Sequence, residues 1–350
     1  MCKVDVVKLD GETICQVELD LGCSVGMLKF EIMKISHIPI AEQLLSYSDM
    51  MLSDADLLLT ILGLIDVAEV TLSIFRRAVL LGTQSSLPHN YTSRPVLEHT
   101  CLNQLLSVGE IAIASSAEPI SRTAVFYGRA GAGKSAMATW LVGHEELQAY
   151  FEQIVWLKFG QQLSEWKAIQ QLGRLLGVLS HEEAFSDGVI GRHELEQRIN
   201  GRLQGNRTLL VSDDVWTRDQ LRAFNGLTAS GGVLAHLMTT RNHQLAAEHS
   251  GYGEVEHITP MQNEEARMLL ERVSGSTMND SDASAVLKHC RGSPAILRSM
   301  ATLCRLRGVH GALERVEQWK RSGNWTTRMP AASVCYVAIT LEMTIDDLDS

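Results

Sequence analysis

Residues 128–135 read GRAGAGKS. Four residues separate two glycines in this stretch, and Lys134 and Ser135 follow the second glycine, which is the spacing of a phosphate-binding loop. Successive backbone N–H groups of such a loop face the β-phosphate of a nucleotide, and the N-terminal end of the following helix adds positive charge. The lysine reaches the β- and γ-phosphates, and the hydroxyl group binds Mg²⁺. We therefore predict nucleotide contacts from Gly128, Gly131, Ala132, Gly133, Lys134, Ser135 and Ala136.

The residues on either side of the loop have the secondary structure that this chemistry requires. TAVFY (123–127) is an apolar, β-rich run, and SAMATWLV (135–142) contains helix formers with Met137, Trp140 and Leu141 at helical spacing. The sequence therefore predicts a strand, a glycine loop and a helix in that order, which argues against a chance match of the loop pattern.

Composition and charge exclude several classes of protein. The 350 residues are 45% apolar and the mean hydropathy is near zero, which is typical of folded domains with a sizeable core and not of a disordered chain. The formal net charge is −10, and lysines and arginines are scattered singly. We therefore expect neither nucleic acid nor an acidic membrane surface as a partner.

Cysteine usage and the apolar pattern predict a cytoplasmic protein. The seven cysteines form no Cys-x-x-Cys or Cys/His ligand spacing, and an odd number in a chain of this size indicates reduced thiols. The N-terminal MCKVDVVKLDGE alternates apolar with polar residues, unlike a signal peptide, and no apolar stretch is long enough for a membrane span.

The pattern of residues 1–77 predicts a small separate domain. KVDVVKL and TICQVEL are alternating strands on either side of the turn signal Asp10-Gly11. Ser24 is placed to cap a helix, and EVTLSIFRR (69–77) is typical of a closing strand. The predicted buried stripe of that helix is Val25, Leu28, Ile32 and Ile35.

This order of elements resembles a ubiquitin-like β-grasp domain. SVGMLKFEI matches the helix of that family, IPIAEQLLSY the segment after it, and LSDADLLL its acidic turn. The chain continues past Arg76-Arg77 without a diglycine end, so the resemblance does not imply a conjugated modifier. The receptor-binding patch of the family falls on Leu9, Ser46 and Ser73, of which only one is apolar. We therefore expect a protein-interaction module or a folded N-terminal cap.

The remainder of the chain predicts an α/β domain and a helical subdomain. Residues 78–94 lack periodicity and contain Gly, Ser and Pro, which indicates a linker. From a helix that begins at about Pro95 to about residue 260, strands alternate with helices, which predicts a doubly wound parallel sheet over 95–260. The strands include QIVWLKF, TLLVSDD and VLAHLMTT, and the helices include SEWKAIQQLGRLL and RHELEQRINGRL. Over 261–330 only helices are predicted.

Two carboxylates end one of the predicted strands. In TLLVSDDVW (208–216), Asp213 and Asp214 lie at the C-terminal end, where an open parallel sheet binds ligands. A nucleotide on the Lys134 loop needs an acidic group there to hold Mg²⁺, so Asp213 is the candidate metal ligand together with Ser135. Asp214 is a candidate to orient or deprotonate the attacking water in ATP hydrolysis. The alternative is that both aspartates form a turn or a helix cap.

An arginine follows the strand VLAHLMTT. In HLMTTRN (236–242), Arg241 stands where a guanidinium can distinguish ATP from ADP through bidentate hydrogen bonds to the γ-phosphate. The alternative is an ordinary solvated surface arginine. Together with Asp214, Arg241 is therefore a candidate catalytic residue.

The order and spacing of GRAGAGKS, QIVWLKF, LLVSDDVW, LMTTRN and CRGSPAI (290–296) resemble the NB-ARC module of signal-transduction ATPases, found in plant resistance receptors and in the apoptosome-forming protease-activating factor. The resemblance covers about residues 90–350. It implies ADP or ATP with Mg²⁺ as ligands, Arg241 as the sensor arginine and Pro294 against the adenine. Arg94, in YTSRPVLEH, would lie on the adenine side. The family has a second hydroxyl residue where this chain has Ala136, so one α-phosphate contact is expected to be missing.

The last residues, 331–350, resemble the beginning of the winged-helix domain of that family. The rest of that domain and the repeats that act as sensors in complete members are absent from this sequence. A chain that ends inside a domain is expected to expose apolar surface, which favours self-association or a continuation of the chain.

Three functional hypotheses are compatible with these motifs. The first is a switch in which ADP holds a closed form, ATP opens it and slow hydrolysis resets it. The second is an ADP-loaded scaffold that acts through the ubiquitin-like domain, which Ala136 and the missing C-terminal residues favour. The third, a metabolic kinase or GTPase, is weaker because no NKxD-type guanine motif is present.

Overall fold

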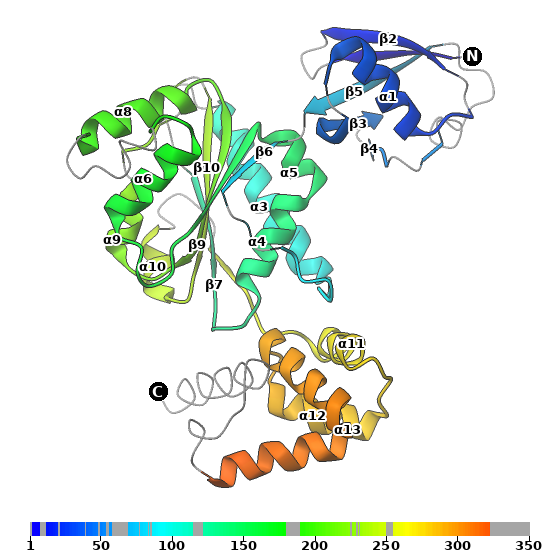
Figure 1. Cartoon of the computed structure of the whole chain (residues 1–350), viewed down its shortest axis with the longest axis vertical. Helices are drawn as coiled ribbons and strands as arrows, with labels where there is room; N and C mark the ends of the chain where they lie inside the picture. Colours follow the sequence, from blue (N-terminus) through cyan, green and yellow to red (C-terminus); the bar gives the residue numbers. More distant parts are fainter. Residues whose placement is uncertain are drawn as a thin grey trace.

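The protein is described by a computed structural model, which combines a small N-terminal sheet, a central parallel sheet and a C-terminal set of helices (Figure 1). The structure describes residues 2–7, 12–19, 22–38, 40–47, 50–53, 56–57, 69–76, 78–82, 84, 86–114, 122–179, 190–224, 226–228, 230, 232–249 and 255–322. The predicted Asp10-Gly11 turn, Leu9 and the predicted start of a winged-helix domain at 331–350 lie outside the described residues.

Among its described residues, the N-terminal unit is a mixed sheet covered by one α-helix. Its elements are β1 (Cys2–Val7), β2 (Thr13–Leu19), α1 (Val25–Ser36), η1 (Ile40–Glu42), β3 (Gln43–Tyr47), β4 (Met50–Met51) and β5 (Glu69–Arg76). The strand order is β2-β1-β5-β3-β4, with β1 parallel to β5 and the other pairs antiparallel. The first and last strands of the unit, β1 and β5, are therefore adjacent in the interior of the sheet.

Helix α1 largely follows its predicted pattern. The Ser24 hydroxyl accepts a hydrogen bond from Met27 N at 3.3 Å, and Leu28 and Ile32 are fully buried against the sheet. The prediction is wrong for Ile35, whose exposed fraction is 52%. Ile35 lies in the last turn of α1, and the chain leaves the helix at His37, which has a left-handed backbone conformation.

The central unit is a six-stranded sheet with helices on both faces. The strands are β6 (Val79–Gly82), β7 (Arg122–Tyr127), β8 (Gln153–Lys158), β9 (Arg207–Val215), β10 (Val233–Thr240) and β11 (Val255–His257). The helices are α3 (Pro95–Ala114), α4 (Lys134–Gly143), α5 (Glu145–Tyr150), α6 (Glu165–Leu175), α8 (Arg192–Leu203), α9 (Arg218–Leu221), η2 (Arg222–Phe224) and α10 (His243–His249). The strand order is β11-β7-β10-β9-β8-β6 and every pairing is parallel, so the predicted parallel sheet is confirmed.

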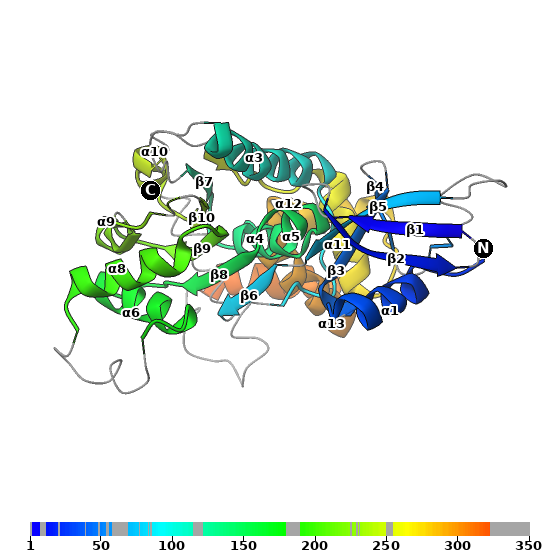
Figure 2. The same cartoon turned by 90° about the horizontal axis from the view of Figure 1, so that it is seen from above.

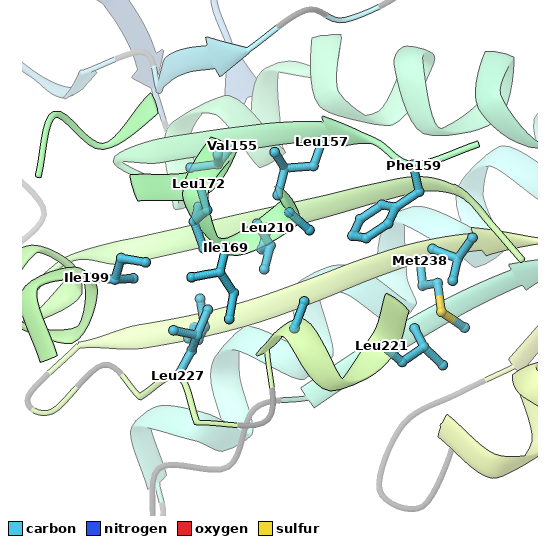
Figure 3. Close-up of a cluster of buried hydrophobic side chains, with 14 of the residues drawn as sticks. Val155, Leu157, Phe159, Ile169, Leu172, Ile199, Leu210, Leu221, Leu227 and Met238 are labelled. Carbon is cyan, nitrogen blue, oxygen red and sulfur yellow. The ribbon is translucent and has the colours of Figure 1, made fainter. Parts of the chain in front are cut away.

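Each face of this sheet carries its own apolar core. Along β8, Val155 and Leu157 pack on the face covered by α6 and α8, whereas Ile154 and Trp156 pack on the face covered by α3, α4 and α5. This alternation follows from the two-residue period of a strand. Figure 3 shows the first face, where Ile169 and Leu172 of α6 and Ile199 of α8 meet the strands. Figures 1 and 2 place α6 and α8 on the side of the sheet away from the N-terminal unit.

The predicted linker contains a strand. Within 78–94, residues Val79–Gly82 form β6 and pair with β8 at the edge of the sheet. Gly82 has a φ of +97°, and a Cβ atom at this position would lie 2.2 Å from the carbonyl oxygen of Trp156. The close approach of the two strands therefore requires glycine. Only a four-residue apolar run marks this strand, too short a signal for a periodicity argument.

The C-terminal unit consists of helices, as predicted. They are α11 (Asn263–Ser274), α12 (Asp280–Cys290) and α13 (Pro294–Ser322), which is interrupted at Gly308. Their core contains Leu269, Leu270, Val286, Leu297 and Met300. Among the described helices, none is long and apolar enough to cross a membrane.

Candidate functional site

The candidate site lies at the C-terminal ends of three adjacent strands. β7, β10 and β9 are neighbours in the sheet and run parallel. Their C-terminal ends therefore meet at one edge, which brings together the loop after β7, the arginine after β10 and the carboxylates at the end of β9. Segments more than 100 residues apart in the sequence thus contribute to one site.

The glycine loop is shaped by residues that adopt left-handed backbone conformations. Gly131 and Gly133 have φ values of +74° and +100°, and α4 begins at the next residue. A Cβ atom on Gly131 would lie 2.7 Å from the side chain of Ala295, the second residue of α13. Glycine is therefore needed at 131 both for the conformation and for the close approach of the helical unit.

Lys134 folds back over the loop. Its Nζ donates hydrogen bonds to the carbonyl oxygens of Gly128 at 2.7 Å and Arg129 at 2.9 Å. The side chain is buried, and this burial, with a further contribution from the charge of Arg241, lowers the pKa of Lys134 to about 8, although the carboxylates of β9 act in the opposite direction. Lys134 is therefore a buried hydrogen-bond donor, and a bound anion would stabilise its charged form.

Asp213 is the centre of the polar cluster. Its Oδ1 accepts hydrogen bonds from the Ser135 hydroxyl at 2.6 Å and from the Thr239 hydroxyl at 2.7 Å. The Asp213 side chain is buried, with an exposed fraction of 2%. Ser135 and Asp213 supply the oxygen ligands that Mg²⁺ prefers, so the predicted metal pair is in direct contact.

A β-bulge places Asp214 in the same cluster. Met238 of β10 faces Ser212 whereas Thr240 faces Val215, so β9 contains one extra residue at this point. Asp214 has a left-handed conformation with φ of +58°, and its backbone N–H donates to the Thr239 hydroxyl at 2.8 Å. In a regular strand, successive side chains point to opposite faces. Because of the extra residue in β9, the side chains of Asp213 and Asp214 need not point to opposite faces of the sheet.

Arg241 lies against Asp214 and not free in solvent. Its Nε is 3.5 Å from Asp214 Oδ1, and its guanidinium lies over the indole ring of Trp216, 4.7 Å from the ring centre. The Arg241 side chain is about one-third exposed. The predicted arginine and the second carboxylate are therefore brought together by the fold.

Arg94 and Pro294 lie at the junction with the helical unit. Arg94 is buried, and its guanidinium donates to Glu265 Oε2 at 3.2 Å and to the carbonyl oxygen of Pro260 at 3.3 Å. Pro294 is the first residue of α13, and its ring lies 3.8 Å from where a Cβ atom on Gly133 would stand. Pro294 therefore lies beside the loop, whereas Arg94 is engaged by a carboxylate.

Three residues of the site were not predicted. The Thr239 hydroxyl links the Asp213 carboxylate to the backbone N–H of Asp214, and Trp216 lies under Arg241. The buried Ser293 hydroxyl lies beside Gly131 with no hydrogen-bond partner in the part of the chain that the structure describes. Each of them lies within two residues of a predicted site residue. Their roles depend on contacts across the sheet. In the sequence, only their closeness to the predicted site residues indicates them.

Comparison with known proteins gives a consistent result. Residues 114–280 match the NB-ARC domain. The chain is 26% identical over 186 residues to the disease resistance protein RPP13 of Arabidopsis thaliana, covering 51% of this chain and 22% of RPP13. It is 28% identical over 190 residues to apoptotic protease-activating factor 1 of Mus musculus, covering 51% of this chain and 14% of that protein.

The disease susceptibility protein LOV1 of Arabidopsis thaliana is also similar, with 24% identity over 209 residues, 55% of this chain and 22% of LOV1. The matches to these three relatives therefore span less than a quarter of each relative. The similarity concerns a nucleotide-binding module and leaves most of each relative without a counterpart in the present sequence.

The hydroxyl of Thr239 gives a test of the site that needs no ligand. Thr239→Val removes the donor to Asp213 and the acceptor for the Asp214 N–H group, so we expect the free energy of unfolding to fall by about 2–3 kcal/mol. Thr239→Ser keeps the hydroxyl and should cost about 1 kcal/mol. Thermal and urea unfolding of both variants would measure the difference, and equal losses would contradict the role assigned to the hydroxyl.

Proposed function

We propose, on the premise that residues 114–280 are an NB-ARC domain, that this protein is an ADP/ATP-binding switch that hydrolyses ATP slowly. ADP holds the helical C-terminal unit in a closed arrangement, exchange for ATP opens it, and hydrolysis restores the closed form. The observation that carries the proposal is the 2.6 Å contact between Ser135 and Asp213 beside the glycine loop. A hydroxyl and a carboxylate in contact match the ligands of a nucleotide-bound Mg²⁺.

The loop fits a diphosphate. In the described structure, Lys134 Nζ donates only to carbonyl oxygens of the loop. A phosphate oxygen can replace these acceptors, and the hydrogen bond is then stronger because it joins a positive to a negative group. The Ser293 hydroxyl, buried and unpartnered among the described residues, adds a donor beside Gly131. Lys134 would bind the β-phosphate, and Ser135 and Asp213 would hold Mg²⁺, which neutralises charge on the phosphates.

The helical unit is placed to respond to the nucleotide. The backbone N–H of Ala295 donates to the carbonyl oxygen of Gly131 at 3.3 Å, and Arg94 is paired with Glu265 on α11. A ligand shifts a conformational equilibrium only through contacts that differ between the two states. The loop contact to α13, and the contact of Arg94 to α11, are proposed to differ between the two states, and Arg241 supplies a further difference for the γ-phosphate.

The N-terminal unit is proposed to be a ubiquitin-like interaction module. The support is its topology, in which the first and last strands, β1 and β5, are adjacent, parallel and interior, and α1 lies between the second and third strands in the sequence. At the positions that correspond to the receptor patch of that family, Ser46 is buried and Ser73 is half-buried. Protein partners of this unit are therefore proposed to use another face, and self-association is proposed for the NB-ARC unit.

A cytoplasmic location is part of the same proposal. Five cysteines are unpaired thiols: Cys15, Cys23, Cys101, Cys290 and Cys304. Four of these five are buried, which is compatible with ordinary core positions in a reducing compartment.

Removal of the Lys134 ammonium tests nucleotide binding. Lys134→Ala should weaken the binding of ADP and of ATP at least tenfold, because the variant loses a charge-assisted contact to the phosphates. The matched control is Lys167→Ala, which removes an exposed lysine on α6 and should leave both affinities unchanged. Isothermal titration calorimetry would measure the affinities, and full retention of binding by Lys134→Ala would exclude the proposed site.

The carboxylate of Asp214 tests hydrolysis separately from binding. Asp214→Asn should abolish phosphate release from ATP while ADP still binds, because an amide cannot take a proton from the attacking water. Phosphate release in single-turnover reactions is the measurement. Tightly held ADP with no exchange and no turnover in the unmodified protein would instead support the alternative function, an ADP-loaded scaffold.

The pKa of Lys134 predicts a pH dependence. The ammonium form is the one that binds phosphate, and its pKa in the free protein is about 8, so the binding-competent fraction falls as pH rises through 8. ADP affinity should therefore drop roughly eightfold between pH 7.5 and pH 9. Lys134→Arg keeps its charge over this range and should lack the drop. A wild-type affinity that stays constant to pH 9 would contradict the prediction.

A further inference from the structure

Trp216 forms a fixed platform under Arg241. The indole follows β9 directly, and the backbone N–H of Trp216 donates to the side-chain oxygen of Gln220 at 2.8 Å. Gln220 is itself buried and donates to the carbonyl oxygens of Gly160 at 2.8 Å and Leu163 at 2.9 Å. The main chain of Trp216 is therefore tied, through Gln220, to the loop after β8 and not to the arginine that rests on the ring.

The indole acts through its face. Trp216 Nε1 is buried and has no hydrogen-bond partner among the residues that the structure describes. The ring centre is 4.7 Å from the Arg241 guanidinium, which is within the range of a cation–π interaction, and tryptophan is the strongest aromatic partner for a cation. Substitution of the indole by an aliphatic group therefore removes the π face without removing a hydrogen bond to the described residues.

Two attractive contacts hold Arg241 in this position. Asp214 Oδ1 lies 3.5 Å from Arg241 Nε, and the Trp216 ring covers the guanidinium. Lys134 is the second cation of the site and is close enough for the charge of Arg241 to contribute to its lowered pKa. The described cluster thus contains two cations, Lys134 and Arg241, and two carboxylates, Asp213 and Asp214, and the nearby positive charges repel each other.

We propose that Trp216 sets the preference between ATP and ADP by holding Arg241 in a resting position from which the γ-phosphate must withdraw it. This inference rests on the proposed nucleotide switch and concerns the regulation of the same site. ADP has no γ-phosphate, so its binding does not require Arg241 to leave the ring. The affinity for ATP is reduced by the fraction of molecules in which Arg241 is held on the ring.

The test compares two ligands in a set of variants. Isothermal titration calorimetry with ADP and with ATPγS, both with Mg²⁺, gives the ratio of the two affinities for the wild type, Trp216→Leu and Trp216→Phe. Trp216→Leu should bind ATPγS about fivefold more tightly, equivalent to about 1 kcal/mol, with ADP affinity unchanged within twofold. Trp216→Phe keeps a weaker π face and should change the ratio by less than Trp216→Leu.

Two controls separate this role from a structural one. Trp140 lies near the other end of α4 from Lys134, so Trp140→Leu should leave the ratio of the ATPγS and ADP affinities unchanged. In an Arg241→Ala background, Trp216→Leu should have no further effect on the ratio, because the ring is proposed to act only through the arginine. An unchanged ratio in Trp216→Leu, or additive effects in the double variant, would overturn the inference. Absence of any nucleotide binding by the wild type would instead overturn the switch itself.

Discussion

The hydrogen bonds of the Thr239 hydroxyl hold the candidate site together. This one oxygen donates to the carboxylate of Asp213 and accepts from the backbone N–H of Asp214, so it links these two residues at the bulge in β9. Asp213 in turn reaches Ser135 at the start of α4. The relative position of the glycine loop and the acidic strand end therefore depends on a residue of the strand that lies between them.

The same hydrogen bonds allow charged side chains to be buried at the site. A carboxylate as deeply buried as Asp213 is tolerated because hydroxyl groups donate to it from two directions. Lys134 is also buried, and its pKa is lowered, so the site carries an electrostatic cost that a bound nucleotide with Mg²⁺ would relieve. A pocket that is costly without its ligand is suited to coupling ligand binding to a change in the surrounding structure.

The helical unit meets the loop through backbone and small side chains. Ala295 contacts Gly131, and Pro294 lies beside Gly133, so the space between α13 and the loop admits little beyond the atoms present. Arg94 and Glu265 join the same two units at a second point. A displacement of the loop by a phosphate group would thus be transmitted to α13 without an intervening flexible segment.

The sequence by itself determined the local parts of this protein: the glycine loop, the alternation of strands with helices, the cap of α1 and the carboxylates at a strand end. These features depend on spacing along a single element, so they can be read without knowledge of its neighbours. Only the tertiary structure decided that Val79–Gly82 joins the sheet, that Ile35 remains exposed, that a bulge redirects Asp214, and that Arg241 rests on Trp216. Each of these depends on pairing or packing between distant segments, which no periodicity within one segment encodes.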